Sequence, residues 1–148
     1  MNRRTFLSAL IKLFFLLLSS VAGLIGLLYS YPAKIRKRKT IYIPVIDEED
    51  IPRRGVKTVY YTYKRGEHTV TTRAFIVNHR GSLYVLSPVC THLGCMVTWH
   101  RKRGEFLCPC HGGRYDIQGL VLGGPPPRPL TRLPMKIQEG KLKIGIKV

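Results

Sequence analysis

The chain has 148 residues, enough for one domain of ordinary size and an additional segment. Its 25 Lys and Arg residues outnumber its eight Asp and Glu residues, which gives a formal net charge of +17 at pH 7. Such a charge is common in nucleic-acid-binding proteins, but the apolar N-terminal segment argues against that class. Anionic lipid head groups and acidic patches on protein partners are the better candidates. A basic surface that is merely solvated is the alternative.

The N-terminal segment, residues 1–31, predicts a membrane anchor. Residues 13–31 carry no charge, and their number matches the roughly 20 residues with which an α-helix crosses the hydrocarbon core of a bilayer. Tyr29 and Tyr31 stand where aromatic side chains meet the membrane interface, and Pro32 is expected to end the helix. Because the stretch is longer than the apolar core of a cleaved signal peptide, we expect an uncleaved helix.

The residues in front of the helix resemble a twin-arginine export signal, with Arg3 and Arg4 followed by Phe6 and Leu7. This route carries folded proteins, so we expect a single-pass protein of a bacterial cytoplasmic membrane, with its N-terminus in the cytoplasm and its head on the outer, periplasmic face. An ordinary basic flank of a membrane helix is the alternative. The basic run at 34–39 opposes this orientation by the positive-inside rule, whereas a disulfide would favour it.

Residues 32–40 are expected to form a basic hinge between anchor and head. Residues 32–39 can extend over roughly 27 Å. Because five of these residues are Lys or Arg, the hinge is a candidate for contact with anionic lipid.

From residue 41 onward the pattern predicts β-strands. The last segment alternates Leu142 and Ile144 with Lys141 and Lys143, which is typical of a half-buried antiparallel strand. No segment of this region has helical periodicity. The expected fold class is all-β, an antiparallel domain over 41–148. The runs rich in β-branched and aromatic residues lie at 41–46, 56–63, 68–77, 82–86, 96–100 and 105–107.

Within this domain we expect a base built from residues 41–86 and 128–148, with a smaller subdomain at 87–127 inserted between its halves. The inserted part contains all four cysteines of the chain, in two short boxes. The boxes are Cys90-Thr91-His92-Leu93-Gly94-Cys95 and Cys108-Pro109-Cys110-His111-Gly112-Gly113.

Cys-x-His together with Cys-x-x-His supplies two thiolates and two imidazoles. A Rieske 2Fe-2S centre needs this set, with two Cys on one iron and two His on the other. Zinc is an alternative, but structural zinc sites more often pair closely spaced cysteines with distant histidines. Two plain disulfides are another alternative, and they leave both histidines unexplained. The candidate metal ligands are Cys90, His92, Cys108 and His111.

The boxes resemble those of the Rieske iron-sulfur subunit of cytochrome bc-type complexes, the quinol–cytochrome c reductases. The likeness extends over roughly residues 85–130, including Tyr115-Asp116-x-x-Gly119 and the run Gly124-Pro125-Pro126-Pro127. It implies an antiparallel Rieske-type fold and a disulfide between Cys95 and Cys110. Oxygenase ferredoxins share the ligand pattern but lack these two cysteines. The resemblance also implies roles for other residues. Leu93 would lie at the docking tip, and His111 would form a hydrogen bond with the quinol. The positions that surround the cluster would be Gly113, Tyr115, Gly124 and Pro125.

The resemblance implies the iron-sulfur subunit of a quinol-oxidising oxidoreductase. Such a subunit takes an electron from quinol through one Rieske 2Fe-2S cluster and passes it to a c-type cytochrome, beside a cytochrome b subunit. The alternative is the Rieske subunit of another exported oxidoreductase, such as an arsenite oxidase. Family members of high potential commonly have Ser at the position of Gly113, donating a hydrogen bond to a cluster sulfur. Its absence predicts a lowered potential, which favours menaquinol as the quinol.

Overall fold

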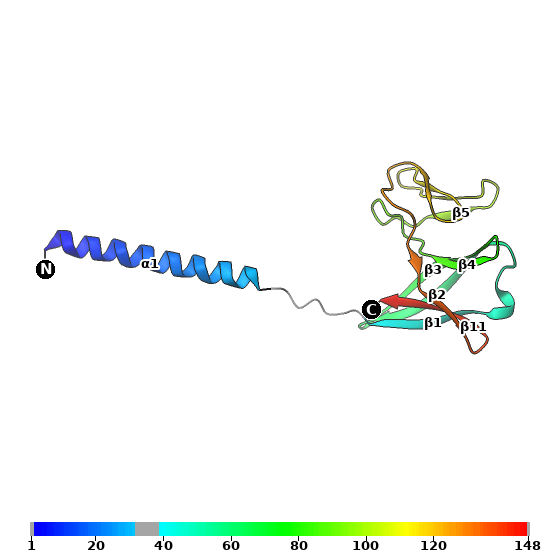
Figure 1. The fold of residues 1–148 in the computed structure, drawn as a ribbon, viewed down its shortest axis with the longest axis horizontal. Helices are drawn as coiled ribbons and strands as arrows, with labels where there is room; N and C mark the ends of the chain where they lie inside the picture. Colours follow the sequence, from blue (N-terminus) through cyan, green and yellow to red (C-terminus); the bar gives the residue numbers. More distant parts are fainter. Residues whose placement is uncertain (1, 32–38, 148) are drawn as a thin grey trace. The chain divides into compact units, whose positions relative to one another are not determined.

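The computed structural model describes residues 2–31 and 39–147, and the chain divides into two compact units, residues 1–37 and 38–148 (Figure 1). The greater part of the predicted hinge, residues 32–38, lies outside the described residues. The predicted boundaries at residues 31 and 40 remain predictions.

The first unit consists of one helix, α1, which runs from Arg3 to Ser30. Its 28 residues correspond to about 42 Å, and it is long and apolar enough to cross a membrane. The hydroxyls of three serines in the apolar part are satisfied within the helix, because each donates to a backbone carbonyl of the preceding turn. The helix begins earlier than the uncharged stretch that predicted it, and it ends two residues before Pro32.

The base of the second unit contains two antiparallel sheets. The first has the order β1-β11-β10 and the second the order β2-β3-β4-β9. Among residues 39–147 the one helical element is a single 3-10 turn, Glu48–Asp50. The strands are β1 Thr40–Asp47, β2 Gly55–Arg65, β3 His68–His79, β4 Ser82–Leu86, β9 Arg132–Leu133, β10 Met135–Gln138 and β11 Lys141–Lys147.

The two sheets of the base share a core. Leu142 and Ile144 of β11 are completely buried, and they pack with Val59, Ile76 and Val85 of the other sheet. This confirms the apolar face predicted for the last segment. On the opposite face Lys141 and Lys147 are exposed as predicted, whereas Lys143 is only 16% exposed and pairs with Glu139.

The inserted subdomain is a four-stranded antiparallel meander, which lies in sequence between β4 and β9 (Figure 1). Its strands are β5 Thr98–His100, β6 Glu105–Leu107, β7 Arg114–Tyr115 and β8 Val121–Gly123. Phe106 and Tyr115 form a second core with Phe75 and Leu86 of the base. The meander is thereby packed onto the sheet that carries it, and the predicted all-β fold class is confirmed.

Candidate metal centre

Both boxes form loops that are closed by the same pair of backbone hydrogen bonds. In each loop the N–H of the first cysteine donates to the carbonyl five residues later, and the N–H four residues later donates back to the carbonyl of that cysteine. The two loops therefore present their side chains on equivalent frames. The four bonds are Cys90 N–H to Cys95 O (2.7 Å), Gly94 N–H to Cys90 O (3.1 Å), Cys108 N–H to Gly113 O (2.8 Å) and Gly112 N–H to Cys108 O (3.1 Å).

The backbone at the fifth position of each loop favours glycine. Gly94 and Gly112 have φ angles of 81° and 67°, in the left-handed region that a residue with a Cβ enters only at a cost. This preference explains why both boxes contain glycine at the same place.

The first cysteines of the two loops are buried and free of any disulfide, Cys90 with 2% and Cys108 with 4% of its surface exposed. Burial by itself raises the pKa of the Cys90 thiol. Hydrogen bonds from Tyr115 Oη, from the backbone N–H groups of His92 and Leu93 and from the Cys108 side chain outweigh burial, so the pKa of Cys90 lies below its ordinary value. The thiolate, which is the form that binds a metal ion, is therefore favoured.

The two box histidines lie at the outer end of the site. The His92 and His111 rings meet edge to face, with their centroids 4.9 Å apart. His92 is half-buried and His111 is exposed, and Leu93 beside them is 71% exposed. The predicted ligands thus form two pairs, the buried thiols of Cys90 and Cys108, which hydrogen-bond to each other, and the two imidazoles nearer to solvent.

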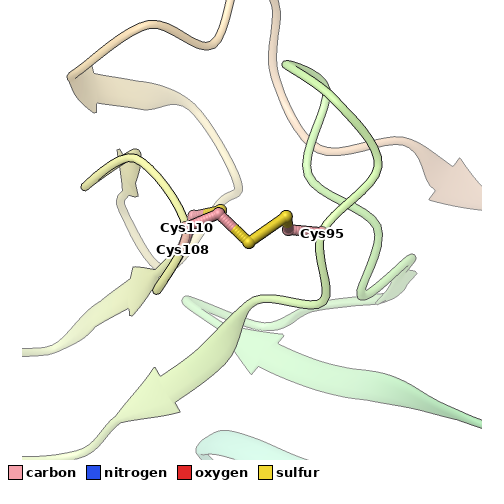
Figure 2. Close-up of side chains that lie close together, drawn as sticks. All are labelled: Cys95, Cys108 and Cys110. Carbon is pink, nitrogen blue, oxygen red and sulfur yellow. A yellow bond between two sulfur atoms is a disulfide. The ribbon is translucent and has the colours of Figure 1, made fainter.

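The second pair of cysteines joins the loops. Cys95 and Cys110 form a disulfide with Cα atoms 6.5 Å apart, drawn as the yellow bond in Figure 2. The predicted disulfide is confirmed. The Cys108 sulfur lies within 4.8 Å of both disulfide sulfurs, but these three atoms are not a metal site, since two of them are bonded to each other.

Tyr115 connects the first loop to the meander. Its ring is completely buried, and its Oη lies 3.2 Å from Cys90 Sγ and accepts a hydrogen bond from the Thr91 N–H at 3.1 Å. The Thr91 hydroxyl donates its proton to the Arg128 carbonyl at 2.6 Å. The Tyr115 proton is therefore left for Cys90 Sγ or for Thr91 Oγ1, which is 3.2 Å away.

The protonation state of Tyr115 suits a donor. Burial, followed by the hydrogen bond with Cys90, raises the pKa of Tyr115 above its ordinary value. The phenol therefore keeps its proton, and a negatively charged sulfur is a better acceptor for it than a neutral hydroxyl. Sequence reasoning found Tyr115 but missed Thr91 and Arg128. The position of Thr91 between two candidate ligands was a signal in the sequence. A backbone carbonyl such as that of Arg128 leaves no signal in the sequence.

The proline run closes the site on the side of the second box. A Cβ added at Gly113 would lie 2.6 Å from Pro126 Cγ and 3.4 Å from Cys108 Cβ. A Cβ added at Gly124 would lie 2.9 Å from the Gly113 Cα. The second box and the proline run therefore touch through their backbones. The buried ring is that of Pro126, which sequence reasoning did not single out, whereas Pro125 is exposed.

The donor set fits a Rieske cluster. Such a cluster needs two thiolates on one iron and two imidazoles on the other. Two buried thiols outside the disulfide and two adjacent imidazoles nearer to solvent provide this combination. Hydrogen-bond donors already surround one of the two sulfurs.

Part of the chain is similar in sequence to curated iron-sulfur subunits. The iron-sulfur subunit of the cytochrome b6-f complex of Chlorobaculum tepidum is 43% identical over 74 residues, which cover 50% of this chain and 41% of that protein. The cyanelle iron-sulfur subunit 2 of the cytochrome b6-f complex of Cyanophora paradoxa is 47% identical over 66 residues, 43% of this chain and 27% of that protein. The matched segment thus spans less than half the length of these curated relatives.

Among solved structures, a chain of a hyperthermophilic respiratory Complex III is 32% identical, covers 89% of this chain and 98% of its own length, and superposes with a TM-score of 0.49. The family model described as the Rieske [2Fe-2S] domain matches residues 42–134, more than half of the chain, and this range includes both boxes, the disulfide and Tyr115. The chain therefore belongs to the Rieske [2Fe-2S] domain family, whose cofactor is the 2Fe-2S cluster.

Proposed function

We propose that the chain is the membrane-anchored electron-transfer subunit of a quinol-oxidising complex of the cytochrome bc type. Its head would take an electron from quinol and deliver it to a c-type cytochrome. The observation that carries this proposal is the polarity of the site, with thiols buried inside and imidazoles at the exposed end. A reactant can approach the histidine side without disturbing the buried side.

Each predicted ligand then has a distinct place. Cys90 and Cys108 would hold the inner iron, and His92 and His111 the outer iron. When bound, the cluster supplies a one-electron carrier. The exposed His111 ring has a second nitrogen, which can accept a hydrogen bond from a quinol hydroxyl and take up its proton. Leu93, 71% exposed beside it, offers apolar contact for docking.

Two features would keep these groups in position. The Cys95–Cys110 disulfide joins the two loops and so limits any change in the spacing between the ligand pairs. Tyr115 donates toward Cys90 Sγ, and such a bond stabilises the more negatively charged, reduced state.

Several observations support a place in a membrane complex. Helix α1 is long and apolar enough for an anchor, and the curated relatives are described as cytochrome b6-f iron-sulfur subunits, which favours a cytochrome b partner. A disulfide favours an oxidising compartment. We therefore place the head outside a bacterial cytoplasmic membrane and the N-terminus inside, reached through the twin-arginine route, with anionic lipid near the basic hinge.

The test is to purify the full chain from membranes and to identify its metal and its companions. We expect two irons and two sulfides per chain, and an electron paramagnetic resonance signal of mixed Cys and His ligation after reduction. A Cys90→Ser variant should lose that signal. Zinc in place of iron would refute the proposal. Cytochrome b among the co-purified proteins supports it, whereas a molybdenum-containing subunit would favour the alternative exported oxidoreductase.

A further inference from the structure

The outer face of the β1-β11-β10 sheet is rich in lysine. Leu142 and Ile144 of β11 face the core, so the alternate residues of that strand lie on the outer face. The sheet register places a lysine of β10 beside them on the same face. The lysines of this face are Lys141, Lys143 and Lys147 of β11 and Lys136 of β10.

Acids gather at one end of this sheet, the end where β1 finishes. The 3-10 turn Glu48–Asp50 follows β1, and its first N–H donates to the Gly140 carbonyl between β10 and β11 at 2.8 Å. Asp47 and Glu139 on either side of this contact each pair with a lysine of β11. This acidic end, residues 47–50 with Glu139, holds five of the eight acids of the chain. The pairs are Lys141 with Asp47 at 3.7 Å and Lys143 with Glu139 at 2.6 Å.

The opposite end of the sheet, where β1 begins, carries cations without a paired acid. Thr40, the first residue of β1, is the partner of Lys147 in the sheet, and Lys39 precedes it. Both lysines are exposed, and no ion pair engages them within residues 39–147. Because β1 has eight residues, about 23 Å separate its two ends. The sheet is therefore electrically polar along its strands.

Tyr42 adds an aromatic ring to the same end. The ring lies across β11, since a Cβ added at Gly145 would be 3.2 Å from Tyr42 Cε1. The Lys136 Nζ lies over the ring, 4.4 Å from its centroid. The pKa of Glu139 is lowered mainly by its hydrogen bond with Lys143 and least by Lys136, so the charge of Lys136 is largely uncompensated. We call Lys39, Tyr42, Lys136 and Lys147 the lysine end.

The lysine end is also the end from which the chain continues to α1. Seven residues, 32–38, stand between Tyr31 and Lys39, and a chain of that length reaches at most about 29 Å. With α1 as a membrane anchor, Lys39 is therefore kept within reach of the lipid head groups. The connecting residues add four cations and no acid, namely Lys34, Arg36, Lys37 and Arg38.

Contact through the outer face of this sheet leaves the candidate metal centre free. Successive residues of β3 face opposite sides, with Ala74 and Ile76 packed in the core shared with β11, and Phe75 and Val77 in the core shared with the meander. The second sheet thus lies between the first sheet and the inserted subdomain. A surface bound to the outer face of the first sheet does not cover the exposed histidine end.

We propose that the lysine end rests on anionic lipid head groups of the membrane that α1 crosses, while the acidic end points away from them. Lysines near an anionic membrane are attracted by its negative surface potential, which decays within a Debye length. Acids about 23 Å away lie beyond that range, and the polarity of the sheet sets the orientation. Tyr42 suits the interface, where aromatic rings with a polar tip are enriched. The inference rests on the proposed membrane anchoring and adds a resting position for the head.

The test uses the full-length holo-protein in vesicles of phosphatidylcholine, with or without phosphatidylglycerol. A share of the phosphatidylcholine carries a nitroxide on its head group, which quenches nearby tryptophan fluorescence. Tyr42→Trp places a reporter at the lysine end. Tyr60→Trp is the matched reporter, because Tyr60 is 69% exposed on β2 and lines a cleft with Met96 of the inserted subdomain. The wild-type protein, whose one tryptophan is Trp99, gives the background.

Charge variants are made in the Tyr42→Trp protein. The docking variant carries Lys39→Glu and Lys147→Glu. The matched control carries Arg101→Glu and Arg103→Glu, which change the net charge equally at exposed positions between β5 and β6. An unchanged electron paramagnetic resonance signal of the reduced cluster verifies that each variant is folded.

We expect stronger quenching of the Tyr42→Trp reporter with phosphatidylglycerol than without it, weakened by added salt. The docking variant should lower the ratio of docked to free heads by about 10-fold or more, while the control pair leaves it near the starting value. The Tyr60→Trp reporter should stay unquenched in both lipids. Equal quenching in the two lipids, equal quenching of the two reporters, or equal losses in the two charge variants would overturn the proposal. Absence of lipid-dependent quenching in a chain that holds its cluster and binds cytochrome b would refute this inference and leave the proposed function standing.

Discussion

Replacing Tyr115 by Phe tests how the protein sets the potential of its cofactor. The substitution removes only the hydroxyl, which lies 3.2 Å from Cys90 Sγ and accepts the Thr91 N–H. The ring stays buried against the same neighbours, so no cavity opens. We expect the midpoint potential to fall, because the reduced site is the more negatively charged state and loses a donor.

The size of the fall follows from the hydrogen bond. A bond to a charged acceptor contributes roughly 1.5–3 kcal/mol, and about 1.4 kcal/mol shifts a one-electron couple by about 59 mV. A bond made only in the reduced state would therefore be worth roughly 60–130 mV. Tyr115 already donates toward a thiolate in the oxidised state, so only the extra strength that this hydrogen bond gains on reduction affects the potential. We therefore expect the midpoint potential to fall by about half of that range.

The assay is a redox titration followed by electron paramagnetic resonance, with Tyr84→Phe as the matched control. Tyr84 belongs to the same core, but its hydroxyl donates to the Ile117 carbonyl at 3.3 Å, and no hydrogen bond joins it to a cysteine in the described head. Its variant should keep the wild-type potential. An equal shift in both variants, or no fall in Tyr115→Phe, would refute the reasoning.

Three further predictions concern other parts of the chain. Gly113→Ser should destabilise the head by about 1–3 kcal/mol, since the Cβ of the new side chain would overlap Pro126. Its hydroxyl should nevertheless raise the midpoint potential relative to Gly113→Ala by up to roughly 60–130 mV. Equal potentials in the two variants would contradict a hydrogen-bond donor role for the serine. Serine at either end of the disulfide should leave the ligands in place but shorten the lifetime of the cluster absorption. Arg3→Lys with Arg4→Lys should leave holo-protein in the cytoplasm in cell fractionation, and normal membrane delivery would mean another route.

The parts of the site that could be predicted from the sequence are those fixed by local spacing. Two boxes with Cys and His at short intervals identify a donor set, because the ligands come from single tight loops. The two-residue strand β7 could not be predicted, because two residues are too few to show the repeated alternation of apolar and polar side chains that marks a strand. Its partners, β6 and β8, define it instead.

Contacts between distant segments were also beyond the sequence. The position that lacks the hydroxyl, Gly113, was visible in the sequence, but the ring of Pro126 that occupies the neighbouring space was not. The start of α1 differs from the prediction for another reason. The absence of charge predicts only the part of the helix that lies in the apolar layer of a membrane. The helix itself begins earlier, because Arg3, Arg4 and Lys12 are all compatible with a helical backbone.

The closeness of the Cys108 sulfur to the Cys95–Cys110 bond, within 4.8 Å, has a consequence for maturation. A free thiolate so near a disulfide can attack it and exchange partners. With Cys108 on iron, as proposed, that reaction is blocked. Iron insertion needs reduced thiols, whereas closing the bond needs an oxidant. Under the proposed export of the folded head, the cluster would therefore enter first, in the reducing cytoplasm, and the disulfide would close only outside the membrane.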